Sequence, residues 1–382
     1  MTSSSHPNKN HGKDISNSNQ KHLSFLQLLY YLIEPGSGKF FAPWEIPLFY
    51  GSPLLLLLIV SSCCNGDNNA WSSSFLGLAF QNIKNQFLLF LFVVQIPLLL
   101  TGKMTYVDIG WPTGLVLLAY QILVHDNDIY ESRVPYVGIM LLLHGGRLAC
   151  GAYYVFFPYI FDKDLPRYEY AHERWIQLSG SNNEWLWKVK QQQETLLQAF
   201  ANAFFIGIPL CLVATNPRLR NGSTWLEVVA AVCWLLFWCL ESWADGQKVH
   251  FLVHNTKENR KTAVLGYPPY DQYWLWTWCR HPNYFCEWMC WNSVALLSVS
   301  SVWEFVIMIA QQQHQKSSTV FYVLLLFSLT CIYLCRVFYD CLRYWTGSEP
   351  AEARSVQRRP LYRKYQDQTP PFFPRRPQRV PE

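Results

Sequence analysis

The sequence predicts an all-α protein that spans a membrane, and two features of its composition support that prediction. Only 15% of the 382 residues are charged, whereas 51% are hydrophobic and 16% are aromatic; soluble domains carry about 25% charged residues. Between polar ends, charge-free runs approach the ~20 residues that a helix needs to cross a bilayer. So little charge excludes a secreted or a nucleic-acid-binding globular protein, which needs ionisable groups to cover its surface.

Apolar windows divide the middle of the chain into candidate membrane helices. They cover residues 46–62, 86–102, 107–123, 134–157, 196–215, 224–244, 284–309 and 319–342. These windows predict a bundle of about seven or eight spans. If both ends of the chain face the cytoplasm, most loop Lys and Arg residues lie on the cytoplasmic side, as the positive-inside rule requires. Both termini are therefore expected in the cytoplasm, and the endoplasmic reticulum is the expected membrane.

Three parts of the chain differ in composition. Residues 1–40 are rich in Ser, Asn, His and Lys and are predicted to form a disordered tail. Residues 41–345 form the predicted transmembrane helical domain. Residues 346–382 are basic and aromatic, a composition that suits either lipid headgroups or the phosphates and rings of a bound cofactor.

Most of the twelve cysteines lie within the apolar windows, where a thiol packs as a small hydrophobic group. The spacings Cys286-x-x-x-Cys290 and Cys331-x-x-x-Cys335 come without the nearby His and Cys partners of a zinc site. The sequence therefore predicts packing cysteines and no metal site.

Charged residues near bilayer depth are the first indication of a functional site, because each costs roughly 2.5–3.5 kcal/mol to insert. Glu241, Asp245 and Lys248 share one helix face at the end of the 224–244 window. They could also mark a helix leaving the membrane, with a surface ion pair of little energy. Their spacing leaves both interpretations open.

A second polar group opens the next apolar window. The segment Arg280-His281-Pro282-Asn283-Tyr284 begins a predicted helix, since Pro282 suits a first turn, and Glu287 lies one turn beyond Asn283. The alternative is a helix start served by Asn283, with Glu287 paired to Arg280. Such a pair needs neither His281 nor Tyr284 beside it, so the segment favours a binding site.

These motifs resemble the steroid 5-alpha-reductase-like membrane proteins, above all their large branch with the Arg-His-Pro-Asn-Tyr-x-x-Glu motif. The resemblance rests on residues 280–291, on Glu241-x-x-x-Asp245-x-Gln247 before them, and on the C-terminal residues 359–374. It extends to Asp108-Ile109-Gly110-Trp111-Pro112, and to Arg147-Leu148 and Arg167-Tyr168 in the middle of the chain.

The resemblance implies an NADPH-dependent reductase that transfers hydride to a conjugated carbon–carbon double bond of a lipid or steroid-like enone. The resemblance also implies that the cofactor lies in an intramembrane cavity open to the cytoplasm. No Gly-x-Gly-x-x-Gly fingerprint is present, so a Rossmann site is not expected. The family's cofactor contacts fall on Glu241 and Asp245, where Glu241 replaces an Asn, and on Asn283 and Glu287, which match.

Further candidate cofactor-binding residues carry the cations and rings that suit a dinucleotide. They are Lys248, Arg280, His281, Tyr284, Arg358, Tyr362 and Tyr365. Arg358 stands where the family has a His. Hydride transfer builds negative charge on the carbonyl oxygen, which calls for an acid or a strong hydrogen-bond donor there. The catalytic candidates are Asp108, with Tyr106 beside it, and Glu287, although Asp108 also suits the start of a helix.

Two other functions remain open. Isoprenylcysteine carboxyl methyltransferases share an Arg-His-Pro-x-Tyr helix start and a C-terminal Tyr-x-x-Tyr, and they bind S-adenosylmethionine. The face that carries Glu241 and Asp245 has no counterpart in them, and the adjacent acidic pair expected before Tyr362 is missing. A non-enzymatic lipid-binding or scaffold protein would explain why Glu241 and Arg358 depart from the pattern. Membrane lipid and an apolar small molecule are expected partners, and nucleic acid is not.

Overall fold

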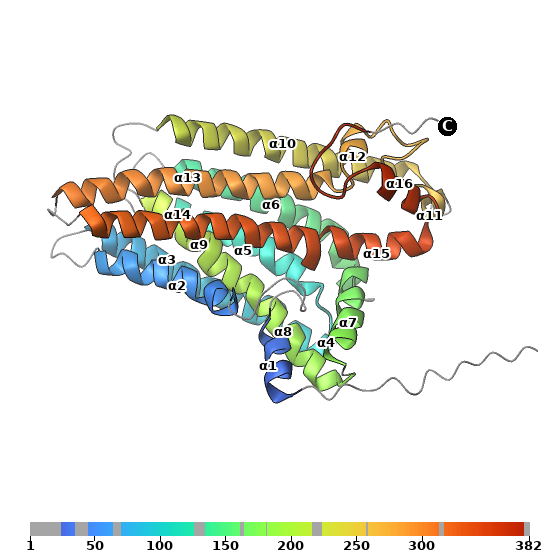
Figure 1. The fold of residues 1–382 in the computed structure, drawn as a ribbon, viewed down its shortest axis with the longest axis horizontal. Coiled ribbons are helices and arrows are strands. Elements are labelled where there is room, and N and C mark those ends of the chain that lie inside the picture. The colour runs from blue at the N-terminus through green and yellow to red at the C-terminus, as the bar shows by residue number, and fades with distance from the viewer. Residues whose placement is uncertain are drawn as a thin grey trace, which may run out of the picture.

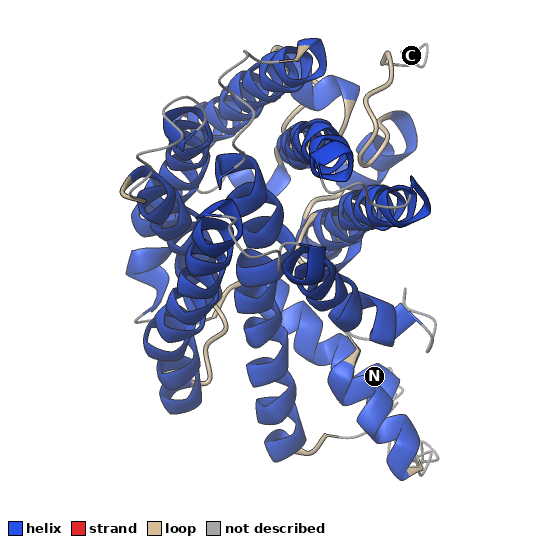
Figure 2. Cartoon of the chain, turned by 90° about the vertical axis from the view of Figure 1, so that its left-hand side faces the viewer, coloured by secondary structure: helices blue, strands red, loops and turns tan. Residues whose placement is uncertain are grey.

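The computed structural model shows an all-helical bundle, and the part of the chain that it describes contains no β-strand (Figures 1 and 2). The described residues are 24–34, 45–63, 70–125, 134–160, 164–180, 182–215, 224–256, 259–312 and 317–377. The all-α prediction is therefore confirmed. Most of the expected N-terminal tail lies outside the described residues, and within it Phe25–Ile33 form helix α1, capped by Ser24.

Helices follow one another along most of the described chain. Before the middle they are α2 (Glu45–Cys63), α3 (Ala70–Phe90), α4 (Ile96–Thr101), α5 (Tyr106–Leu123), α6 (Val134–Ile160), α7 (Pro166–Ser179), α8 (Glu184–Phe200) and α9 (Gly207–Thr215). After it they are α10 (Trp225–His254), α11 (Asn259–Thr262), α12 (Trp274–Trp278), α13 (Pro282–Gln312), α14 (Ser317–Asp340), α15 (Ser348–Arg358) and α16 (Tyr362–Gln368). Among the described residues, the π-helical turns η1 (Leu91–Gln95), η2 (Ala201–Ile206) and η4 (Cys341–Trp345) continue neighbouring helices.

Each apolar window of the sequence lies on a helix. Within the described residues, four helical stretches are long and apolar enough to cross a membrane: Ser73–Thr101, Glu184–Thr215, Trp225–His254 and Leu324–Arg358. Such stretches are typical of a membrane protein. The larger number of seven or eight spans stays a prediction.

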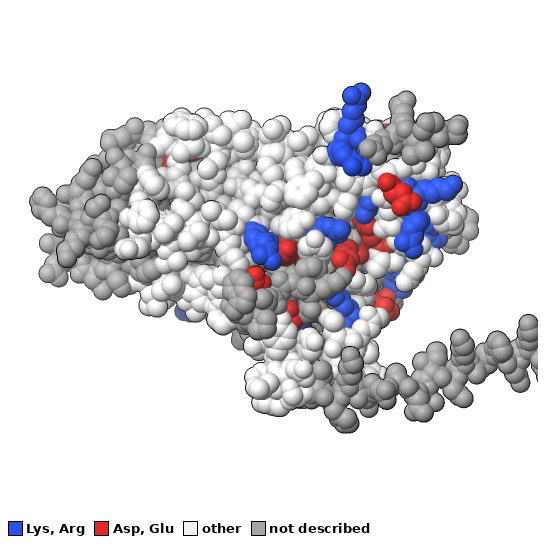
Figure 3. Space-filling view, viewed as in Figure 1, with Lys and Arg blue, Asp and Glu red and all other residues white. Residues whose placement is uncertain are grey.

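The helices that build the site run side by side. Helices α10, α13 and α14 lie in neighbouring rows, and α5 packs against α6 (Figure 1). Helices α11, α12, α15 and α16 gather at one end of these rows, where α7 also lies (Figure 1). On the face seen in Figure 3, most of the described charged side chains lie from the middle of the molecule toward this same end.

A buried polar network fixes the π-helical turn η2 against α3 and α5. Asn82 donates to the backbone carbonyls of Asn202 and Ala203 at 3.4 and 3.3 Å, and Gln86 donates to the carbonyl of Gly114 at 2.8 Å. A Cβ atom at Gly114 would lie 2.3 Å from the Asn202 amide nitrogen. A π-helical turn displaces backbone groups from the regular hydrogen-bond pattern of a helix. The network supplies hydrogen-bond partners for these groups and so fixes one wall of the cavity described below.

Candidate functional site

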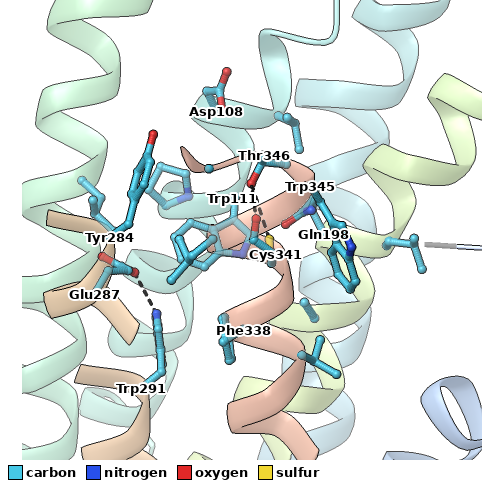
Figure 4. Close-up of a pocket in the computed structure, with 18 of the residues that line it drawn as sticks. Asp108, Trp111, Gln198, Tyr284, Glu287, Trp291, Phe338, Cys341, Trp345 and Thr346 are labelled. Atoms are coloured by element: carbon cyan, nitrogen blue, oxygen red, sulfur yellow. Dashed lines mark hydrogen bonds between the residues drawn. The ribbon is translucent and has the colours of Figure 1, made fainter. Parts of the chain in front are cut away.

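A cavity of about 320 Å³, here called the inner chamber, lies among α5, α6, α8, α10, α13 and η4 (Figure 4). Large apolar and aromatic side chains form most of its wall, among them Trp111, Phe205, Trp291, Leu334, Phe338 and Trp345. Helices α10 and α13 contribute the polar side chains Glu241, Asp245, Asn283 and Glu287, and further polar side chains come from α5, α7 and α8. An apolar hollow with a few polar groups on one side is the usual form of a small-molecule site.

One guanidinium joins the carboxylates of α10 and α13. Arg147 of α6 donates from Nη1 to Asp245 Oδ2 at 2.7 Å and from Nη2 to Glu241 Oε1. Its Nη2 also lies 3.8 Å from Glu287 Oε2. Arg147 therefore holds three acidic side chains from two helices in one place.

Glu287 has two further partners on the side away from Arg147. His144 Nε2 lies 3.1 Å from Glu287 Oε1, and Trp291 Nε1 donates to the same oxygen at 2.7 Å (Figure 4 shows the Trp291 contact). Glu287 and His144 are only 6% and 2% exposed. These contacts fix the Glu287 carboxylate at the chamber wall.

Asn283 presents an unused acceptor next to this cluster. Its Nδ2 donates to Asp245 Oδ1 at 3.1 Å, which orients the amide. Its Oδ1 is buried and has no hydrogen-bond partner within the described structure. Because Asn283 lines the inner chamber, this oxygen is an acceptor for a ligand N–H group.

Asp108 lies on the opposite wall of the inner chamber, held by two residues of α7. Tyr168 donates its hydroxyl to Asp108 Oδ2 at 2.9 Å, and Arg167 forms an ion pair with Asp108 Oδ1. Burial raises the pKa of Tyr168 well above its usual range, so the hydroxyl keeps its proton and remains a donor. All three residues line the chamber.

A second hollow of about 350 Å³, here called the outer basin, runs along α15 and meets the chamber near the residues that precede this helix. Its wall carries the cations Lys248, Arg354, Arg358 and Arg359. Arg354 Nη1 lies 2.7 Å from Glu169 Oε2 in a partly exposed pair, and Lys248 Nζ lies 6.0 Å from the centroid of the Trp276 ring. The basin therefore has a strongly positive lining, which suits phosphate groups.

Three residues line both hollows and form the junction between them: Arg167, Tyr284 and Thr346. In Figure 4, Tyr284 and Asp108 lie toward one end of the inner chamber, whereas Glu287 and Trp291 lie deeper. The site thus runs from a positive entrance, past an arginine and a tyrosine, to an apolar interior with acidic groups on one wall.

Arg280 and His281 lie outside both hollows and hold the C-terminal segment instead. Arg280 donates from Nε and Nη2 to the two oxygens of Glu352 at 2.9 and 3.0 Å, and its backbone N–H donates to the carbonyl of Pro370. His281 Nε2 lies 2.8 Å from Glu352 Oε1. Burial lowers the pKa of His281, although Glu352 acts in the opposite direction. This cluster fastens α15 and the following residues to the start of α13.

Tyr362 and Tyr365 also have structural contacts. Both pack with Val264 in a small apolar cluster, and Tyr365 donates its hydroxyl to the backbone carbonyl of Trp276. Burial raises the pKa of each tyrosine above its usual range. Neither residue lines the inner chamber or the outer basin.

The structure therefore brings together most of the candidate residues from the sequence. Asp108, Glu241, Asp245, Asn283, Tyr284 and Glu287 line the inner chamber, and Lys248 and Arg358 line the outer basin. Tyr106 lines neither hollow and packs against the apolar cluster that contains Met104 and Val107. The tyrosine that reaches Asp108 is Tyr168.

Sequence reasoning missed the roles of His144 and Arg147, which lie in the 134–157 window. The cost of inserting a charge into the membrane, which indicated Glu287, applies equally to a guanidinium in an apolar window. The same reasoning could therefore have identified Arg147 from the sequence. Arg147 and Arg167 were noticed only as part of a resemblance, although Arg147 contacts three carboxylates and Arg167 lines both hollows.

Arg280→Gln is expected to release the C-terminal segment. Removing one partner of a buried ion pair costs roughly 3–5 kcal/mol, and Glu352 would lose its two-pronged partner. Trypsin should then cleave the folded protein much faster at the exposed residues Arg363 and Lys364. Arg354→Gln is the matched control, because it breaks an exposed pair of the same segment, worth at most about 1 kcal/mol. Equal cleavage rates in both variants would contradict the structural role of Arg280.

The chain matches the model of a family described as proteins of unknown function (DUF1295) over residues 91–369. No curated protein and no solved structure matches the chain. The matched range contains every residue of the outer basin and nearly all of the inner chamber.

Proposed function

The chain belongs to the DUF1295 family, and for this member we propose an NADPH-dependent membrane reductase of the steroid 5-alpha-reductase-like type. Its reaction is the reduction of a conjugated carbon–carbon double bond in a lipid or steroid-like enone. The observation that carries the proposal is the junction of a largely apolar chamber with a basin lined by five basic side chains.

The residues present fit NADPH part by part. The cations of the outer basin, among them Arg358 and Arg359, match the pyrophosphate and the 2′-phosphate, which an arginine binds with two N–H groups. The unpartnered Oδ1 of Asn283 matches the amide N–H of the nicotinamide carboxamide. The aromatic wall beyond it leaves an apolar space for the acceptor.

When bound, NADPH supplies the hydride that reaches the β carbon of the enone. The chain's own task is to stabilise the negative charge that then develops on the carbonyl oxygen. Tyr284 is our candidate donor, because it lies at the junction and its hydroxyl makes no hydrogen bond within the described structure. Arg167 beside it adds positive charge, and Asp108 and Tyr168 hold that guanidinium in position.

The proposal includes an orientation. The outer basin faces the cytoplasm, where the dinucleotide is found, and the C-terminal segment closes over it. The gathering of charged side chains at this end supports that orientation (Figure 3), as does the excess of loop Lys and Arg residues on the same side. The endoplasmic reticulum remains the proposed membrane.

A methyltransferase of the isoprenylcysteine carboxyl methyltransferase type is the alternative that the experiment must exclude. S-adenosylmethionine carries a positive sulfonium and no phosphate. A basin lined by Lys248, Arg354, Arg358 and Arg359 repels such a ligand and attracts a phosphorylated one.

The test is a fluorescence titration of the purified protein in detergent with NADPH. Wild-type protein should bind NADPH and should not bind S-adenosylmethionine. Asn283→Ala should weaken NADPH binding about tenfold, since a lost buried hydrogen bond costs roughly 1–3 kcal/mol. Asn292→Ala is the matched control on the same helix, because its amide contacts only the Met289 sulfur within the described structure.

Two outcomes would overturn the proposal. One is binding of S-adenosylmethionine in place of NADPH, which would assign the protein to the alternative class. The other is an unchanged NADPH affinity in both Asn283→Ala and Glu287→Ala, which would separate the inner chamber from the cofactor.

A further inference from the structure

Three metal-ligand side chains from three helices meet behind the acidic wall of the inner chamber. His144 of α6, Glu241 of α10 and Cys290 of α13 each offer one ligand atom, and these atoms lie within 4.8 Å of one another. The three residues are 2%, 2% and 0% exposed. We propose that they form a zinc site, which shares Glu241 with the wall of the inner chamber and does not depend on whether NADPH binds there.

Each member of the cluster has an unsatisfied atom. Glu241 Oε2 and His144 Nδ1 are buried and have no hydrogen-bond partner within the described structure. The Cys290 thiol has only a long contact of 3.8 Å with the backbone carbonyl of Trp234. A buried polar atom without a partner costs roughly 1–3 kcal/mol, and such groups often mark an ion. One cation held by one ligand atom from each residue would give the three side chains a shared partner.

The surroundings of His144 are those of a metal-bound imidazole. A ligating histidine almost always gives its second ring N–H to a carboxylate or a carbonyl, which fixes the tautomer. His144 Nε2 lies 3.1 Å from Glu287 Oε1, so Nε2 carries the proton and Nδ1 keeps its lone pair. The remaining oxygen of Glu241 is likewise held, by Arg147.

Charge balance also favours a bound cation. Glu241, Asp245 and Glu287 place three carboxylates around the single guanidinium of Arg147. Within the described structure this leaves an excess of two negative charges among mostly buried side chains, which is expensive in an apolar medium. Zn²⁺ adds two positive charges and displaces the Cys290 proton to solvent, so only one negative charge remains.

The ligand types select zinc among common cations. An imidazole nitrogen, a thiolate sulfur and a carboxylate oxygen are the three donor types that Zn²⁺ accepts in tetrahedral sites, whereas Mg²⁺ and Ca²⁺ require oxygen. A void of about 10 Å³ lined by His144, Trp234 and Trp291 adjoins the cluster. Of the three proposed ligands only His144 lines this void, so the tetrahedral site is argued from its three protein donors.

The sequence analysis predicted no metal site, because the cysteine spacings lacked nearby histidine partners. Spacing rules detect ligands that are close in the chain. Here the ligands come from residues 144, 241 and 290, and only the packing of α6, α10 and α13 brings them together.

The experiment measures zinc by mass spectrometry in the full-length protein, purified in detergent without chelator. About one zinc per chain is expected. The zinc content of the Cys290→Ser and His144→Ala variants should fall to background, whereas Cys286→Ser should keep its zinc. Cys286 is the matched control, because it is a buried thiol on the same helix that does not belong to the cluster.

A second measurement uses the unaltered protein and does not depend on how the variants fold. Replacement of zinc by Co²⁺ should produce a thiolate-to-cobalt charge-transfer band in the near ultraviolet, in wild type and in Cys286→Ser. The site is refuted if wild type holds no zinc and shows no cobalt band, or if Cys290→Ser retains both. NADPH titration of the same samples distinguishes failure of the zinc site from failure of the proposed NADPH site, since either zinc or NADPH can bind without the other.

Discussion

Replacing Arg147 by alanine is expected to destabilise the protein by roughly 3–5 kcal/mol, the cost of removing one partner from a buried ion pair. The guanidinium is the shared partner of Asp245, Glu241 and Glu287. Without it, the three carboxylates on two packed helices repel one another in a poorly solvated place. The measurement is thermal unfolding of the purified protein in detergent, followed by intrinsic tryptophan fluorescence.

Two further variants sharpen that experiment. Arg147→Lys should recover part of the stability, because it keeps the charge but lacks the two-pronged donor geometry of arginine. Arg363→Ala should unfold like wild type, since Arg363 is an exposed residue of α16 outside both hollows. If Arg147→Ala also unfolds like wild type, the cluster does not hold α6, α10 and α13 together.

The second large effect is expected in the outer basin. The double variant Arg358→Ala and Arg359→Ala should weaken NADPH binding by about two orders of magnitude or more, because a hydrogen bond to a charged group contributes roughly 1.5–3 kcal/mol. Binding of NADH, which lacks the 2′-phosphate, should weaken less. Salt should reduce the affinity of wild type more than that of the variant, since exposed charges are screened. Fluorescence titration with both dinucleotides measures each effect.

A neighbouring pair of cations provides the control for the basin. Arg363 and Lys364 are exposed and line neither hollow, so their replacement by alanine should leave both affinities unchanged. An equal loss in this control would mean that the whole C-terminal segment attracts anions without a defined site. An unchanged affinity in the basin variant would remove the basin from the proposed cofactor site.

The helical framework could be predicted because lipid imposes a simple rule on sequence. A segment in the bilayer must be apolar and must satisfy its own backbone hydrogen bonds, so apolar windows and helices coincide. The window at 134–157 lies on α6, and that at 284–309 lies on α13. The π-helical turns could not be predicted, because η2 depends on the distant partner Asn82.

The candidate site was predictable where a charge stands out against an apolar background. Glu287 and Asn283 were found in this way, and both line the inner chamber. Arg280 and His281 carry the same signal but serve to hold Glu352. Polar residues that line a ligand site and polar residues that hold another segment give the same sequence pattern. Only the position of Glu352, far along the chain, distinguishes the two roles.

Arg167, Tyr284 and Thr346 stand where the two hollows meet, and this narrow passage has a kinetic consequence under the proposed function. A dinucleotide that reaches through it blocks the passage behind itself. The acceptor must therefore bind first by the same route, or enter laterally from the lipid bilayer between two helices. Compulsory addition of the acceptor before NADPH would indicate the first route, whereas random addition would indicate the second.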